Sequence, residues 1–196
     1  MPTTPMPTIP LPTARIVPLE APFDGAVADL FQKYLPPGMV PLKLFRTVAH
    51  NPRVLQRVFA GSLLDPGSIP LRARELVILR TCARCGCDYE WGVHVALFAR
   101  HAGLSEADLA ATRAPGPVRL PEDLPERDAL LFDAVDQLYE TSTLSAALWS
   151  ALARHYTPAQ ILEVIALAGY YHLISFMANA TGVEAEDAAP GSHHSR

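Results

Sequence analysis

The chain has 196 residues, of which 49% are apolar and 18% charged, and its formal net charge is −4. This apolar fraction is typical of a globular protein and excludes a wholly disordered chain. Proteins that bind nucleic acid usually carry an excess of positive charge, and this chain has a mild excess of negative charge instead. No apolar run reaches the roughly 18 residues that a membrane span needs, and no basic-then-apolar leader is visible at the N-terminus. We therefore expect a cytoplasmic protein that binds neither nucleic acid nor membrane.

Prolines mark the N-terminal boundary of the expected domain. Seven of the 19 prolines lie in the first 22 residues. Because proline lacks an N–H and disfavours the helical conformation of the residue before it, residues 1–22 are expected to form an extended arm. A single helical domain is expected over residues 23–183, and residues 184–196 form a polar tail.

From residue 23 onward the apolar residues recur at helical spacing. A first helix is expected over 23–34, followed by two apolar segments at 42–49 and 54–64. Further helices are expected at about 70–83, 89–101, 105–111, 126–140, 144–154 and 157–181, with a proline-rich linker at 114–125. Ser105 and Thr157 have the sequence features of helix caps. No segment shows the period of two that is typical of strands, so the predicted fold is all-α with about eight helices.

The densest group of reactive side chains lies between Glu75 and His94. Glu90 and His94 are four residues apart and share one face of the expected helix. A tight turn at Gly86 can fold Glu75 on the preceding helix towards them. Two carboxyl groups and an imidazole form a set suited to proton transfer. The alternative is an ordinary i,i+4 ion pair on a surface helix.

All three cysteines lie between residues 82 and 87. Cys82 and Cys85 form a C-x-x-C pair, but at the C-terminal end of a helix, where the helix dipole disfavours a thiolate. Cys87 directly precedes the next helix, where a thiolate is favoured. Its alternative role is that of a small buried apolar residue. Glu75, Cys87, Glu90 and His94 could also ligate a metal, but zinc sites usually have more His or Cys ligands, so we expect no metal.

The last expected helix is apolar apart from a polar stripe of His172, Ser175 and Asn179. Buried polar side chains need partners. The stripe therefore either lines a substrate site or supports a neighbouring helix through hydrogen bonds.

The sequence from Arg74-Glu75 through Glu90-Trp91-x-x-His94 to Ala102-Gly103-Leu104-Ser105 resembles the carboxymuconolactone decarboxylase family. Its superfamily also includes alkylhydroperoxidase-type enzymes. The resemblance implies an alkylhydroperoxidase-like helical fold and a homo-oligomer (a dimer, trimer or hexamer). The hydroperoxidase branch has Cys-x-x-Cys followed by His. Here Cys87 occupies the first of these cysteine positions and Glu90 the second, whereas the decarboxylase branch has the Glu-x-x-x-His that Glu90 and His94 match.

This resemblance implies a lyase that acts on a carboxylated lactone or a similar cyclic molecule without an organic cofactor. His94 is the expected general acid/base, and Glu90 and Glu75 orient it or relay protons. Tyr89, Trp91 and His172 are weaker candidates for contacting the substrate, together with Ser175 and Asn179. Two alternatives stay open: a thiol-dependent redox enzyme that uses Cys87, and a non-catalytic helical oligomer that binds a small molecule.

Overall fold

The computed structural model describes residues 14–114 and 125–187. Within these residues the chain forms helices and no strand, so the all-α prediction is confirmed. The α-helices are α1 (Gly25–Tyr34), α2 (Lys43–Val48), α3 (Pro52–Ala60), α4 (Leu71–Arg84), α5 (Asp88–His94), α6 (Glu106–Arg113), α7 (Glu126–Thr141), α8 (Ala146–Leu152) and α9 (Pro158–Thr181), and a π-helical turn, η1 (Val95–Ala99), continues α5.

Local sequence signals set most of these boundaries. The Ser105 side chain accepts from the Asp108 N–H, and Thr157 accepts from the Gln160 N–H, each within a capping box. These contacts satisfy N–H groups that have no partner inside the helix. At the other end of α9, Gly182 adopts the left-handed conformation that ends helices. Both predicted caps are therefore confirmed.

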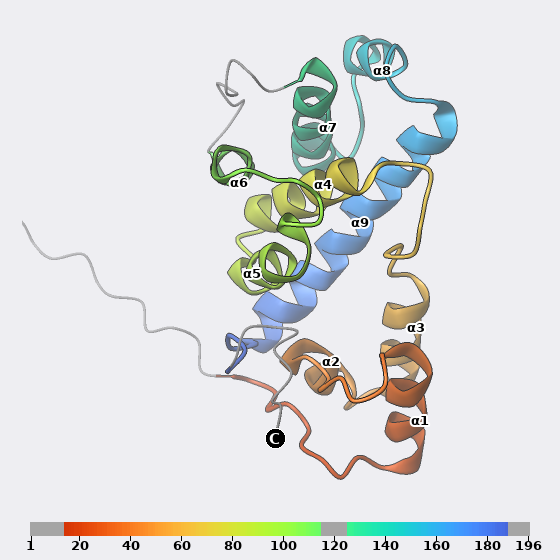
Figure 1. Ribbon diagram of the computed structural model, residues 1–196, viewed down its shortest axis with the longest axis vertical. Coiled ribbons are helices and arrows are strands. Elements are labelled where there is room, and N and C mark those ends of the chain that lie inside the picture. The colour runs from red at the N-terminus through yellow and green to blue at the C-terminus, as the bar shows by residue number, and fades with distance from the viewer. Residues whose placement is uncertain (1–13, 115–124, 188–196) are drawn as a thin grey trace, which may run out of the picture.

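Helices α4 and α9 lie side by side at the centre of the molecule, with α5, α6 and α7 packed around them and α8 against α7 (Figure 1). Helix α4 is buried on almost every side, from Ala73 to Cys82. Helix α9 contributes Val164, Leu167 and Tyr171 to the same core. Helices α1–α3 pack at one end, where α1 and α3 share a second, smaller core. The candidate active site lies where α4, α5 and α9 meet.

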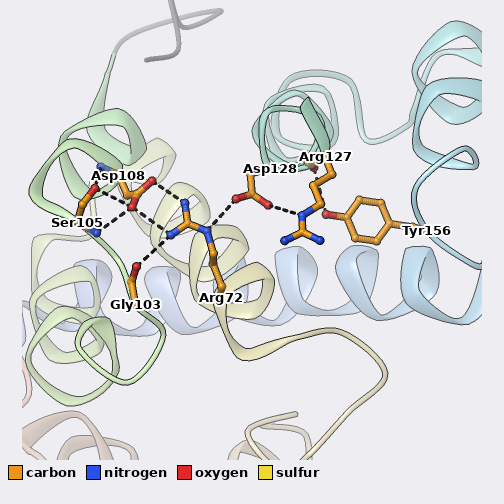
Figure 2. Close-up of polar contacts among 7 residues, drawn as sticks. All are labelled: Arg72, Gly103, Ser105, Asp108, Arg127, Asp128 and Tyr156. Carbon is orange, nitrogen blue, oxygen red and sulfur yellow. Dashed lines mark hydrogen bonds and ion pairs between the residues drawn. The ribbon is translucent and has the colours of Figure 1, made fainter. Parts of the chain in front are cut away.

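Arg72, at the start of α4, joins three helices through ion pairs (Figure 2). Its guanidinium lies 2.6 Å from Asp108 of α6 and 2.8 Å from Asp128 of α7, and also donates to the Gly103 carbonyl. The pKa of Asp108 is lowered to about 2, chiefly by the hydrogen bond from Arg72 and also by hydrogen bonds from Ser105. Charged pairs with this geometry hold α4 at a fixed position against α6 and α7.

Both ends of the described chain lie beside α2 and the C-terminal end of α9 (Figure 1). The Arg15 N–H donates to the Thr181 carbonyl, and Arg46 of α2 forms an ion pair with Glu20. Glu186 accepts from the Lys43 N–H. Residues 14–22 are not helical, in keeping with the expected arm, whereas residues 1–13, most of the linker predicted at 114–125, and residues 188–196 lie outside the described part of the chain.

Among the described residues one helix, α9, is long and apolar enough to cross a membrane by length and composition alone. Core helices of soluble proteins pass the same test, and 44% of the tested window is buried inside this molecule. The finding is weak evidence for a span.

Candidate active site

The turn between α4 and α5 brings the predicted residues together. Gly86 has a φ of +60°, and the Cys87 N–H donates across the turn to the Cys82 carbonyl over 2.8 Å. This is the bonding pattern with which a left-handed glycine ends a helix. The chain reverses there, and α5 packs against α4. Glu75 on α4 thereby comes within reach of the α5 side chains.

His94 lies between two carboxyl groups. Its Nδ1 is 2.8 Å from Glu75 Oε2, and its Nε2 is 3.5 Å from Glu90 Oε1. Glu75 is fully buried, and the other two residues are less than 10% exposed. The interpretation of Glu90 and His94 as a surface ion pair is therefore wrong. The structure instead contains a buried chain of three proton-carrying groups.

Arg74 completes the charge balance of this chain. Its guanidinium lies 2.9 Å from Glu75 Oε1 and also donates to the Leu64 carbonyl. Glu75 thus bridges Arg74 and His94 with its two oxygens. Sequence reasoning placed Arg74 in the family motif but not in the site, because adjacent helix residues usually point to different faces.

These contacts determine the protonation of His94. Burial lowers its pKa, but hydrogen bonds and charge interactions with Glu75 and Glu90 outweigh burial and raise the pKa to about 9. His94 is therefore an imidazolium at neutral pH. The Tyr171 ring packs edge-on against it at 4.9 Å, and the Phe98 ring lies at 5.2 Å. These rings hold the imidazolium in place and keep water from it.

One buried polar atom of this chain, Glu90 Oε2, has no hydrogen-bond partner within the described structure. Buried polar groups are nearly always paired, so this atom needs an explanation. Glu90 of α5 and Ser175 of α9 both interact with the thiols of Cys82 and Cys87. A polar group of a bound molecule would satisfy Glu90 Oε2.

Cys82 and Cys87 are buried and Cys85 is half-buried, and all three are free thiols. Burial is the main cause that raises the pKa of Cys82 and of Cys87, although the Ser175 hydroxyl lowers the pKa of both. The pKa of Cys85 is also raised, again chiefly by burial. The expectation that the start of α5 would favour a Cys87 thiolate is therefore wrong, because the loss of hydration exceeds the stabilisation by nearby donors.

The remaining predicted residues divide into two groups. Ser175 lies beside the thiols, and the Asn179 side chain donates to the Cys85 carbonyl. Three others make contacts away from the Glu75–His94–Glu90 chain: the Tyr89 hydroxyl bonds Glu186 and the Leu44 N–H, the Trp91 indole donates to Thr112, and the His172 ring stacks on Tyr139.

The π-helical turn η1 begins directly after His94. Such turns are rare and occur frequently at functional sites, because the extra residue rotates the side chains on either side of it. Sequence periodicity predicted one regular helix over 89–101 and gave no sign of this turn. Among residues 14–114 and 125–187, no group of three or more His, Cys, Asp or Glu side chains is arranged to hold a metal ion.

Residues 52–116 match the carboxymuconolactone decarboxylase family. The family resemblance is thus confirmed over the segment that carries Glu75, Glu90 and His94. No curated protein matches the sequence.

Solved structures share the fold over almost the whole chain. An uncharacterized peroxidase-related protein from Ralstonia eutropha JMP134, described as an alkylhydroperoxidase AhpD core, is 22% identical with a TM-score of 0.69, covering 94% of this chain and 95% of its own. Another from Silicibacter sp. TM1040 is 18% identical with a TM-score of 0.72, covering 97% and 99%. The debrominase Bmp8 is 17% identical with a TM-score of 0.68, covering 91% and 95%. The predicted alkylhydroperoxidase-like fold is confirmed, and the family match supports an enzyme that acts on a small molecule.

Proposed function

We propose that this protein is a cofactor-independent lyase that removes carbon dioxide from a carboxylated lactone or a similar activated cyclic molecule. The observation that carries the proposal is the buried Glu75–His94–Glu90 chain, whose outer carboxyl has one oxygen, Glu90 Oε2, without a partner. Such a chain stores a proton and presents it at one end.

The reaction needs a proton at carbon. When the bond between the ring and its carboxylate breaks, carbon dioxide leaves and the electron pair passes to the conjugated carbonyl of the substrate. The resulting enolate takes up one proton at carbon. The proton starts on the His94 imidazolium: His94 passes it from Nε2 to the Glu90 carboxylate, Glu90 delivers it to the carbon, and solvent reprotonates His94 after product leaves. A preorganised donor in a site that excludes water lowers the barrier to this step.

The Glu75 and Arg74 side chains have a supporting role. Glu75 accepts from His94 Nδ1, which fixes the imidazole so that Nε2 faces Glu90. Arg74 in turn orients Glu75. These are positioning residues, because neither is placed to touch the substrate.

One solved structure with the same fold contains a cyclic ligand, which supports a cyclic substrate for this protein. A cysteine-to-alanine variant of the debrominase Bmp8 was solved with 2,3,4-tribromopyrrole, a substituted ring; it is 19% identical to this chain, with a TM-score of 0.65 and 94% of this chain covered. The proposed substrate is likewise a small substituted ring. Its charged carboxylate distinguishes it from that ligand.

A thiol-dependent redox function is the second candidate. The observation in its favour is the Ser175 hydroxyl, which lies beside all three thiols and lowers the pKa of each. Two observations weigh against it. Burial raises the pKa of Cys87, and Glu90 occupies the position where the hydroperoxidase branch has its second cysteine.

The test is turnover of a panel of carboxylated lactones in D₂O, with product analysed by mass spectrometry. The wild type should release carbon dioxide and incorporate one deuterium per product. His94→Ala and Glu90→Gln should each reduce kcat by about 100-fold or more, the typical contribution of a general acid. The exposed His101→Ala is the matched control and should keep full activity, as should the triple Cys→Ser variant.

Two outcomes would overturn the proposal. One is an unchanged rate in His94→Ala. The other is loss of activity on Cys87→Ser together with a disulfide that forms on stoichiometric hydroperoxide, which would establish the thiol function instead.

A further inference from the structure

The hydroxyl of Tyr171, in the middle of α9, is a buried donor that the fold leaves unused. Tyr171 is 2% exposed, and its ring packs edge-on against His94 at 4.9 Å and against Tyr170 at 5.4 Å. Among the described residues, none forms a hydrogen bond with this hydroxyl. Buried tyrosine hydroxyls usually have a partner, and a phenylalanine would fill the same space without needing one. The hydroxyl therefore needs a role outside the packing of the core.

Tyr171 differs in this respect from the other tyrosines that are shielded from solvent. Burial also raises the pKa of three other tyrosines. Each of these donates a hydrogen bond within the fold: Tyr89 to Glu186, Tyr156 to the Arg127 carbonyl, and Tyr170 to the Val58 carbonyl. The O–H group of Tyr171 is thus available to a bound molecule.

The Tyr171 hydroxyl lies on the Glu90 side of His94. The pKa of Tyr171 is raised well above its ordinary value, first by burial, then by the charge of Glu90, and after it by that of Glu75. Glu75 is the more deeply buried carboxyl group, and charge interactions weaken with distance and with hydration. The larger effect of Glu90 therefore indicates that Glu90 is the nearer of the two. Since Glu90 Oε2 also has no partner in the described structure, a free donor and a free acceptor lie on the same side of the imidazolium.

We propose that the Tyr171 hydroxyl is a catalytic hydrogen-bond donor, which stabilises the enolate oxygen of the substrate while Glu90 protonates the carbon. This inference rests on the proposed function and adds a requirement on the substrate. The carbonyl that receives the electron pair must be conjugated with the carbon that bears the carboxylate. The oxygen of this conjugated system must reach Tyr171 when its carbon reaches Glu90.

The electrons and protons of the step balance with these groups alone. The bond between the ring carbon and the carboxylate breaks, carbon dioxide leaves, and the electron pair of that bond turns the carbonyl oxygen into an enolate oxygen. This oxygen accepts the hydrogen bond from Tyr171. When the proton of Glu90 is added to the carbon, the carbonyl forms again. Tyr171 keeps its own proton throughout, because burial and the two carboxyl groups raise its pKa.

A neutral donor suits this position. Carboxyl groups flank His94 on both sides, so negative charge that develops on a substrate oxygen beside them is disfavoured. A donor that is already oriented stabilises such an oxygen without further rearrangement. The ring contacts of Tyr171 with His94 and Tyr170 hold the hydroxyl in place before substrate binds.

Urea unfolding of Tyr171→Phe tests whether the hydroxyl serves the fold. Tyr156→Phe is the matched control, because it also removes one buried hydroxyl from the core, but one that donates to the Arg127 carbonyl. Tyr171→Phe has no hydrogen bond to lose and should unfold at the urea midpoint of the wild type or above it, whereas Tyr156→Phe should unfold at a lower midpoint. A midpoint lowered as much in Tyr171→Phe as in the control would overturn the proposal.

Binding of 4-nitrophenolate, titrated by absorbance at pH 8, tests the donor without turnover. The delocalised oxyanion on its ring resembles the enolate. The wild type and Tyr156→Phe should bind it with the same Kd. Tyr171→Phe should bind it about 10-fold more weakly or worse, the usual loss for a hydrogen bond to a charged group. A wild type that does not bind the phenolate, or a Kd that is unchanged in Tyr171→Phe, would refute the assignment of this donor.

Kinetics on the carboxylated lactone that the wild type turns over fastest separate this inference from the proposed function. Tyr171→Phe should lower kcat about 100-fold with little change in KM, the typical effect of removing one donor to an oxyanion, and should still incorporate one deuterium per product. Tyr156→Phe should keep the wild-type rate. An unchanged kcat in Tyr171→Phe would overturn the role of Tyr171 and leave the lyase function standing. Phenolate binding that depends on Tyr171, without turnover of any lactone, would confirm the donor and overturn the lyase function.

Discussion

The protonation of His94 can be measured directly, and it connects the stability of the fold to the chemistry of the site. Its pKa is raised from the ordinary 6.5 to about 9. Because one pKa unit corresponds to about 1.4 kcal/mol, this rise favours folding by about 3 kcal/mol. A group whose pKa is higher in the folded state contributes fully below pH 6.5. Its contribution is lost as the pH rises through 9.

Glu75→Gln is the perturbation that tests this reasoning. It removes the negative charge 2.8 Å from Nδ1 and leaves the shape of the side chain nearly unchanged. Without the charge of Glu75, the lowering of the pKa by burial outweighs the remaining effect of Glu90, so the pKa of His94 should fall to 6.5 or below. Below pH 6.5 the variant should be less stable than the wild type by about 3 kcal/mol, and the two should converge above pH 9.

Two assays are needed. NMR of ¹³C-labelled histidine gives the His94 pKa, and urea unfolding between pH 6 and pH 10 gives the difference in unfolding free energy. Glu106→Gln, at an exposed glutamate of α6, is the control and should change neither quantity. A wild-type His94 that titrates at or below 6.5, or a pKa that is the same in Glu75→Gln, would refute the assignment of His94 as a stored proton.

Three further predictions concern the scaffold and the thiols. Arg72→Met leaves the carboxylates of Asp108 and Asp128 without their shared cation and should lower the unfolding free energy by about 3 kcal/mol; an unchanged urea midpoint would show that the ion pairs contribute nothing. Leu167→Ala, at a fully buried position of α9, should cost about 3 kcal/mol by the same assay, and a loss under 1 kcal/mol would show that the core closes around the gap. Ser175→Ala should raise the pKa of the half-buried Cys85 and slow its alkylation by iodoacetamide at pH 8, with the unfolding free energy as the control; an unchanged rate would remove Ser175 from the thiol group.

Local patterns were sufficient to predict the helices. The caps at Ser105 and Thr157 and the glycine ends at Gly86 and Gly182 depend only on neighbouring residues and backbone conformation. The i,i+4 spacing likewise placed Glu90 and His94 on one face. The π-helical turn after His94 escaped prediction, because its residues are apolar and carry no local signal that distinguishes them from an ordinary helix.

The sequence by itself determined the helical fold, the main boundaries and the set of Glu75, Glu90 and His94, since these follow from spacing and short-range hydrogen bonds. Only the tertiary structure decided the protonation states of the site residues. Burial against Tyr171 and pairing with two carboxyl groups make His94 an imidazolium, and burial keeps Cys87 a thiol. Protonation depends on hydration and on charges brought together from distant parts of the chain, and both arise only when the helices pack.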